Sequence, residues 1–129
     1  MKKMIFLMAI FLSFASSSYA WTLKSGTYDV AGGNSDWGGT GYRGEVVIIP
    51  QGDTSKVIWR INGQQTQVGI GILQDDVFSV AFTDLSNAAF WGIASYRVGP
   101  WGDLEGRWCS FDQATTKPEV LKWRNYNTY

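Results

Sequence analysis

Glycine is the feature of this chain that most restricts its fold. All 15 glycines lie beyond residue 20, where they make up about twice the usual share of a globular protein. The stretches between them are rich in β-branched and aromatic residues, and none shows a convincing helical apolar repeat. Glycine weakens helix interiors but fits tight turns and bends in sheets. The pattern therefore predicts an all-β chain of many short strands.

Eight segments carry strand signals, and the links between them have hairpin length. Asn62-Gly63 is the dipeptide that type I′ hairpin turns favour, while Gln51–Thr54 and Gly99–Gly102 are strong chain breakers. The expected strands are approximately Gly26–Val30, Tyr42–Ile49, Lys56–Ile61, Thr66–Leu73, Val77–Thr83, Phe90–Val98, Asp103–Ser110 and Glu119–Trp123.

Alternation within these segments predicts one buried face for each strand. An apolar residue at every second position, with polar or small residues between, is typical of antiparallel sheets that cover a core. The side chains expected on the buried face are Val57, Trp59 and Ile61; Val68, Ile70 and Ile72; Phe78, Val80 and Phe82; and Leu104 with Trp108.

Short strands joined by hairpin links most simply form an antiparallel meander, and about eight of them can close into a single small barrel. Closure removes both exposed sheet edges. A two-sheet β-sandwich is the alternative architecture. We do not expect an outer-membrane barrel, because membrane strands need about 9–11 residues with an apolar outer band. Here Arg60, Arg97 and Arg107 would face lipid.

Residues 1–20 have the pattern of a secretory signal peptide. Lys2-Lys3 forms a charged start, Met4–Phe14 is an apolar run, and Ser18 and Ala20 place small residues at the −3 and −1 positions of a cleavage site. The apolar run is shorter than the roughly 20 residues that cross a bilayer. We therefore expect a periplasmic or secreted protein that does not span the membrane after cleavage, with residues 21–129 as one β-barrel domain.

The composition argues against several kinds of chemistry. The chain contains no histidine, which is the commonest general base and a frequent metal ligand. Cys109 is the single cysteine, so no internal disulfide can form, and no histidine is present to activate its thiol. The 11 basic and 11 acidic residues balance, so the basic footprint of nucleic-acid binding is missing. We expect no catalytic residues, no metal ion, no cofactor and no nucleic-acid partner.

A series of strand motifs resembles a family of small secreted bacterial β-domains that are often labelled fibronectin-binding. The motifs are Gly26-Thr27-Tyr28-Asp29-Val30, Tyr42-Arg43-Gly44-Glu45-Val46, Val57-Ile58-Trp59-Arg60-Ile61, Gly69-Ile70-Gly71-Ile72-Leu73, Ser95-Tyr96-Arg97-Val98 and Leu104-Glu105-Gly106-Arg107-Trp108, with Glu119 and Leu121 after them. The resemblance covers nearly all of the chain after residue 20. It implies an exported meander barrel of the avidin or lipocalin type. The tryptophan-bearing loop at 32–41 and the aromatic C-terminal tail depart from it.

The seven tryptophans are more than core packing requires, and three of them are candidate binding residues. Trp37 and Trp101 lie in glycine-rich turns, where they either form a contact surface or fold back as plugs over a barrel end. Trp91 stands next to Phe90 in a strand, so one of these two faces solvent or a cavity.

These features favour a non-enzymatic binding module that contacts a host or envelope protein through its loop aromatics. The alternatives are a periplasmic inhibitor or immunity-type protein, and a barrel that binds a small apolar ligand. A hydrolase that pairs Glu45 with Glu105 is the least favoured alternative.

Overall fold

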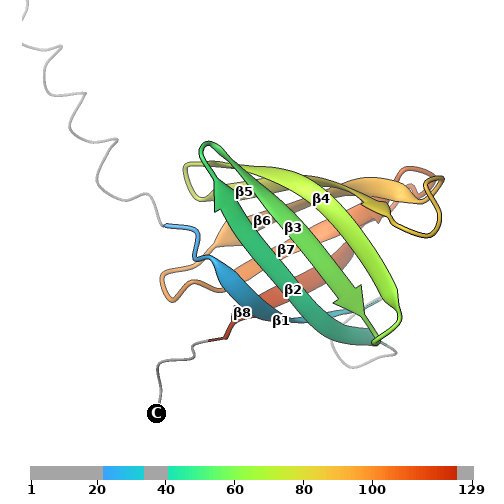
Figure 1. The fold of residues 1–129 in the computed structure, drawn as a ribbon, viewed down its shortest axis with the longest axis horizontal. Helices are drawn as coiled ribbons and strands as arrows, with labels where there is room; N and C mark the ends of the chain where they lie inside the picture. Colours follow the sequence, from blue (N-terminus) through green and yellow to red (C-terminus); the bar gives the residue numbers. More distant parts are fainter. Residues whose placement is uncertain (1–21, 34–40, 125–129) are drawn as a thin grey trace, which may run out of the picture.

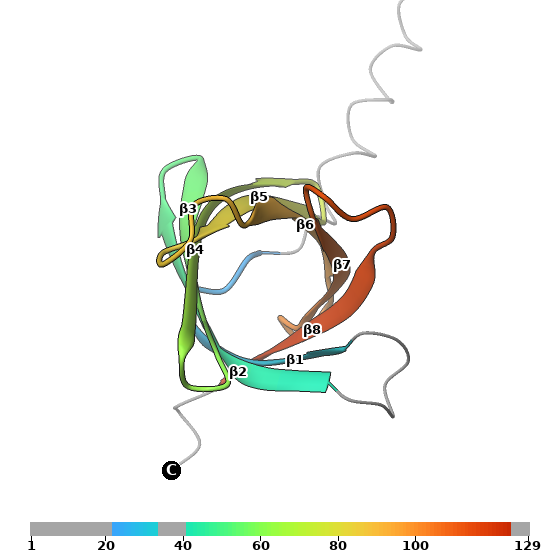
Figure 2. The ribbon, with the colours of Figure 1, turned by 90° about the vertical axis from the view of Figure 1, so that its right-hand side faces the viewer.

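Each of the eight predicted segments forms a strand in the computed structural model, which describes residues 22–33 and 41–124. The strands pair in chain order around a closed ring (Figure 1; Figure 2). Their bounds are β1 Gly26–Gly33, β2 Gly41–Gln51, β3 Thr54–Ile61, β4 Gln65–Gln74, β5 Val77–Asp84, β6 Trp91–Val98, β7 Leu104–Ser110 and β8 Lys117–Trp123.

The pairing of the first strand with the last closes the barrel. Strands β1 and β8 run antiparallel, from the pair Tyr28 and Trp123 to the pair Gly32 and Glu119. Every other neighbouring pair is also antiparallel and consecutive in sequence. The predicted meander barrel is therefore confirmed, and the sandwich alternative is wrong. Within the described ranges, no helix is both long enough and apolar enough to span a membrane.

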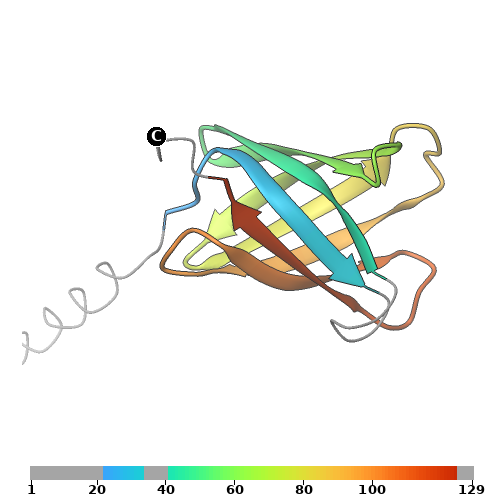
Figure 3. The same cartoon turned by 90° about the horizontal axis from the view of Figure 1, so that it is seen from below.

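The two ends of the barrel carry different connections, as the view from below shows (Figure 3). The end that we call the Asn62 end carries the links β3–β4, β5–β6 and β7–β8. The opposite end, here the Trp101 end, carries the links β2–β3, β4–β5 and β6–β7. Asn62 and Gly63 both have positive φ, at 52° and 75°, as the central residues of a type I′ turn require.

The core is packed most tightly toward the Trp101 end. Five strands each place a completely buried, inward-facing side chain within three residues of their end there. These side chains are Tyr28, Ile48, Phe78, Leu104 and Leu121. The inward faces predicted for β3, β5 and β7 are all confirmed by burial, with Trp108 only partly buried.

The predicted face of β4 is wrong. Ile70 and Ile72 point outward and are 53% and 52% exposed, while Gly69 and Gly71 occupy the inward positions. A Cβ atom on Gly71 would lie 2.6 Å from Cζ of Phe78. The bulk of Phe78 on β5 therefore leaves no room for side chains on this part of β4, which overrides the apolar character of the isoleucines.

Candidate functional site

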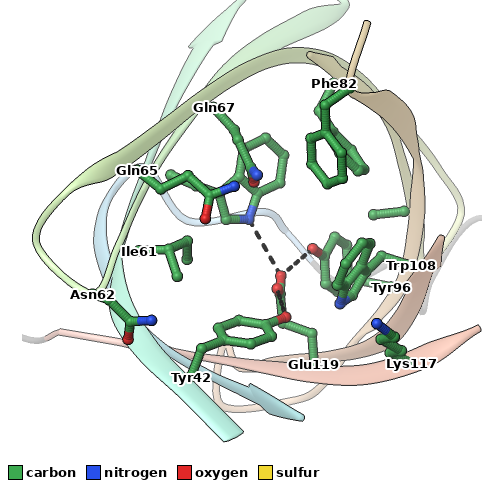
Figure 4. A pocket seen from close by; sticks show the side chains of 13 residues that line it. Tyr42, Ile61, Asn62, Gln65, Gln67, Phe82, Tyr96, Trp108, Lys117 and Glu119 are labelled. Carbon is green, nitrogen blue, oxygen red and sulfur yellow. Dashed lines mark hydrogen bonds between the residues drawn. The ribbon is translucent and has the colours of Figure 1, made fainter. Parts of the chain in front are cut away.

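The barrel interior opens into a cavity at the Asn62 end. Its volume is about 280 Å³, roughly that of nine water molecules in the liquid. Inward-facing residues of β2 to β8 and the links at this end form its walls (Figure 4). They are Tyr42, Trp59, Ile61, Asn62, Gln65, Gln67, Phe82, Phe90, Ala94, Tyr96, Trp108, Lys117 and Glu119.

A buried carboxylate stands in the wall of this cavity, on β8. Glu119 is 4% exposed, and its neighbours across the sheet are glycines on both sides: Gly32 on β1 and Gly106 on β7. The residues beyond these glycines are tyrosines, Tyr42 on β2 and Tyr96 on β6. The ladder thus forms one row across five strands, with Glu119 in the middle and a tyrosine two strands away on each side.

The missing side chain at Gly32 is what lets Tyr42 reach the carboxylate. A Cβ atom on Gly32 would lie 2.3 Å from both Cζ and the hydroxyl oxygen of Tyr42. The ring of Tyr42 therefore crosses directly over Gly32, and its hydroxyl donates a hydrogen bond to Oε2 of Glu119. Any larger residue at position 32 would meet this ring.

Two further donors serve the other carboxylate oxygen. The Tyr96 hydroxyl donates to Oε1 of Glu119 at 2.5 Å, and the indole Nε1 of Trp59 donates to the same atom at 3.2 Å. Dashed lines in Figure 4 mark the hydrogen bonds at the Glu119 carboxylate, including those from the labelled Tyr42 and Tyr96. Glu119 forms no ion pair with any residue of 22–33 and 41–124.

Burial raises the pKa of Glu119 above its ordinary value of 4.5, because removal from water disfavours the charged form. The hydrogen bonds from Tyr42, Tyr96 and Trp59 oppose this effect, in that order, because they stabilise the carboxylate. Burial is the larger influence. Desolvation also raises the pKa of Tyr42 and Tyr96, and the nearby Glu119 charge raises both further, so each hydroxyl keeps its proton and acts as a donor.

One wall of the cavity is aromatic, and most of its rings belong to β5, β7 and the β5–β6 link. Phe82 is at its centre, with ring centroids 5.7 Å from Trp59, 6.1 Å from Phe90 and 6.1 Å from Trp108. The rings meet at tilted or edge angles, which suit the aromatic quadrupole. The wall around the β3–β4 link is polar instead, and it consists of Asn62, Gln65 and Gln67 (Figure 4).

Trp108 and Lys117 form a directly opposed pair between β7 and β8. The Lys117 ammonium lies 5.3 Å from the centroid of the Trp108 ring, within reach of a cation–π contact. The Nε1 of Trp108 is buried and lowers the pKa of the nearby Tyr42 as a donor would, but it makes no hydrogen bond of ordinary geometry with the residues that the structure describes. Ala94, the neighbour of Trp108 on β6, is small and leaves the space beside it open.

The tryptophans predicted as binding residues do not line this cavity where the structure describes them. Trp101 lies in the β6–β7 link at the opposite end and is 83% exposed, so it is not a plug. Trp91 points outward from β6 and stacks on Phe111 at 4.8 Å, while its neighbour Phe90 faces the cavity. Trp37 lies outside the described residues. Their role in binding a partner stays a prediction.

The carboxylates considered for hydrolysis point outward from the barrel. Glu45 on β2 is paired with Arg124, and Glu105 on β7 is exposed to solvent. Among the described residues, no group of three or more histidine, cysteine or acidic side chains is arranged to hold a metal ion.

Sequence reasoning missed the centre of the cavity. In the sequence Glu119, Tyr42 and Tyr96 stand only as members of strand motifs, and Lys117 lies just before the last predicted strand. One signal was available: Tyr42 shares its alternation with Val46 and Ile48, which are completely buried in the same strand.

Comparison with known proteins supports the architecture. No model of a known protein family and no curated protein matches this chain. A redesigned β-barrel matches it with a TM-score of 0.68 at 17% identity, over 85% of this chain and 99% of that one. The redesigned barrel mFAP1, solved bound to DFHBI, gives 0.63 at 18% identity over 83% and 100%. A de novo designed fluorescence-activating barrel gives 0.59 at 16% identity over 78% and 94%. At these identities the likeness establishes the fold alone.

Proposed function

We propose that this protein is an exported, non-enzymatic binding protein that holds one small molecule in the open end of its barrel. The observation that carries the proposal is the cavity of about 280 Å³. An eight-stranded barrel either fills its interior with side chains or holds one small ligand. Here side chains fill the interior toward the Trp101 end, and the cavity at the Asn62 end supports the binding of one small ligand.

The lining of the cavity supports a ligand over bulk water. Ligand sites are mostly apolar and aromatic, with a few convergent polar groups that fix orientation. The aromatic wall around Phe82 supplies the apolar surface, and the amides near Gln67 with the charged residues Lys117 and Glu119 supply the polar groups. We also propose that the protein is exported and that it belongs to the family of secreted β-domains that its sequence resembles.

The test is a small-molecule screen with a variant that fills the cavity. Ala94 is 4% exposed and faces the cavity, whereas Ser95, the next residue on β6, faces solvent. Compounds of one to three rings, DFHBI among them, are titrated against the purified protein by calorimetry. We expect hits that lose binding in Ala94→Leu and keep it in the control Ser95→Leu. A screen without binders, or hits that survive Ala94→Leu with the fold intact, would contradict the proposal.

Binding of a protein partner is a second candidate, and the exposure of Trp101 favours it. Exposed tryptophans that become buried in an interface are common hot spots. Because Trp101 lies at the end away from the cavity, the two functions are separable. Trp101→Ser should weaken a protein partner and leave small-molecule binding unchanged.

A further inference from the structure

The strongest hydrogen-bond acceptor in the cavity is occupied, whereas its one cationic donor is not. The acceptor Glu119 is already used by Trp59, Tyr42 and Tyr96. The amides of Gln65 and Gln67 keep neutral acceptor oxygens, since the one side-chain bond of Gln65 is donated by its Nε2 to Asp84 at 3.3 Å. A ligand that brings another donor would therefore find its strongest potential acceptor occupied.

The unused donors are close together, on the opposed pair of β7 and β8. Lys117 lines the cavity and makes no hydrogen bond or ion pair with any described residue. The ammonium lies over the ring of Trp108, whose own indole N–H has no acceptor within the described part of the chain. A cationic donor in a cavity without a counter-charge from the described residues calls for an acceptor that carries negative charge.

We infer that the ligand is an aromatic carboxylate of one or two rings. Its carboxylate would accept hydrogen bonds from the Lys117 ammonium, and its ring would lie against the wall formed by Phe82 and Trp59. This inference rests on the proposed function and adds the chemical class of the ligand to it. The size follows from the cavity of about 280 Å³, which is at the small end of ligand sites.

The negative charge of Glu119 would repel an anionic ligand, but the position of this carboxylate keeps it away from the ligand's own carboxylate. Three donors already surround that carboxylate, and it is 4% exposed, so it presents little free acceptor surface to the cavity. Lys117 is partly exposed on the same face of β8, two residues along the strand. A ligand that enters from the Asn62 end can therefore pair with Lys117 without touching the Glu119 oxygens.

The experiment uses three probes that share one ring system and differ in charge. They are naphthoate, its neutral amide naphthamide, and the cation naphthylmethylammonium, each titrated into the purified protein by calorimetry. We expect naphthoate to bind about tenfold or more tightly than either of the others. In Lys117→Met, which keeps the length of the side chain, this preference over naphthamide should disappear. In Lys122→Met, an outward-facing control on the same strand, it should persist.

Other outcomes overturn the inference. The inference is wrong if naphthamide or naphthylmethylammonium binds as tightly as naphthoate or more tightly. It is also wrong if Lys117→Met keeps the full preference for naphthoate over naphthamide. If no naphthyl probe binds but other compounds show binding that Ala94→Leu abolishes, the aromatic carboxylate is wrong and the proposed function stands. If nothing binds in either experiment, the proposed function fails as well.

Discussion

Removal of the Glu119 carboxylate should destabilise the barrel, because it leaves three donors without an acceptor. In Glu119→Ala the hydroxyls of Tyr42 and Tyr96 and the indole N–H of Trp59 all lose their partner. A buried donor without a partner costs about 1–3 kcal/mol. The variant also avoids the desolvation of a buried charge, and water entering the open cavity can replace part of the loss. We expect a net loss of about 3–5 kcal/mol in the free energy of unfolding.

Glu119→Gln should lose much less. The amide oxygen can still accept from Tyr96 and Trp59, and the change removes the cost of burying a charge. Only the bond from Tyr42 must rearrange, because the amide nitrogen replaces its acceptor. We expect a change of about 1 kcal/mol at neutral pH.

The assay is urea unfolding followed by far-ultraviolet circular dichroism, which avoids changes in tryptophan emission near the mutated site. Glu105→Ala is the matched control, because Glu105 is an exposed glutamate on the neighbouring strand. Its effect should stay within about 0.5 kcal/mol, as at ordinary surface sites. A loss below about 1 kcal/mol in Glu119→Ala would refute the argument that this carboxylate organises its three donors.

Three other perturbations test the pKa of Glu119, the space at Gly32 and the exposure of Trp101. Because burial raises the pKa of Glu119, the free energy of unfolding of the natural protein relative to Glu119→Gln should be highest below pH 4.5 and fall as pH rises. Urea unfolding curves at several pH values would measure this difference. A difference that grows with pH would contradict the burial argument. Gly32→Ala should cost about 1–3 kcal/mol in urea unfolding, and less when Tyr42 is already phenylalanine, because the new methyl group then meets the ring but no hydroxyl. Equal losses in both backgrounds would mean that the hydroxyl has no part in this collision. Trp101→Ser should change the free energy of unfolding by less than about 0.5 kcal/mol, because its side chain is 83% exposed; a larger loss would show that it packs on the barrel end.

The fold was predictable because, in most strands, the alternation of apolar and polar residues indicates which face points inward. In β3 the apolar Val57 and Ile61 alternate with the charged Lys56 and Arg60, so only one orientation buries the apolar side and solvates the charges. The Asn62-Gly63 turn then follows at once and sets the register of the next strand. Local patterns of this kind carry enough information to define a meander.

The face of β4 could not be read in the same way. Its glycines and isoleucines alternate, so hydrophobicity points the isoleucines inward, whereas the volume of the interior points them outward. The deciding contact is with Phe78, which lies on another strand and whose ring needs the space that Gly71 leaves. Packing volume is a property of the assembled barrel and is not visible in one strand.

The cavity was hidden for a related reason. Glu119 lies beside Val120 and Leu121, so the apolar residues of β8 fall on both faces and do not say which way the carboxylate points. Its donors come from positions 77, 60 and 23 residues away in the chain. The row that joins Tyr42 to Glu119 exists only once β1 pairs with both β2 and β8.

The two halves of the barrel interior differ in how completely they are packed and in whether they bury charged groups. Toward the Trp101 end, side chains such as Phe78 and Leu121 are completely buried and form a core without charged groups. Toward the Asn62 end, residues 22–33 and 41–124 provide neither an ion pair for the buried Glu119 carboxylate nor an acceptor for the indole donor of Trp108. Both features oppose stability, since a buried charge without a counter-charge and a buried donor without an acceptor each carry a cost. Natural sequences depart from well-satisfied packing mainly at functional sites. The packed half therefore supplies the stability that lets the other half keep an open cavity with unused donors, and this division is the physical reason to look for a ligand at the Asn62 end.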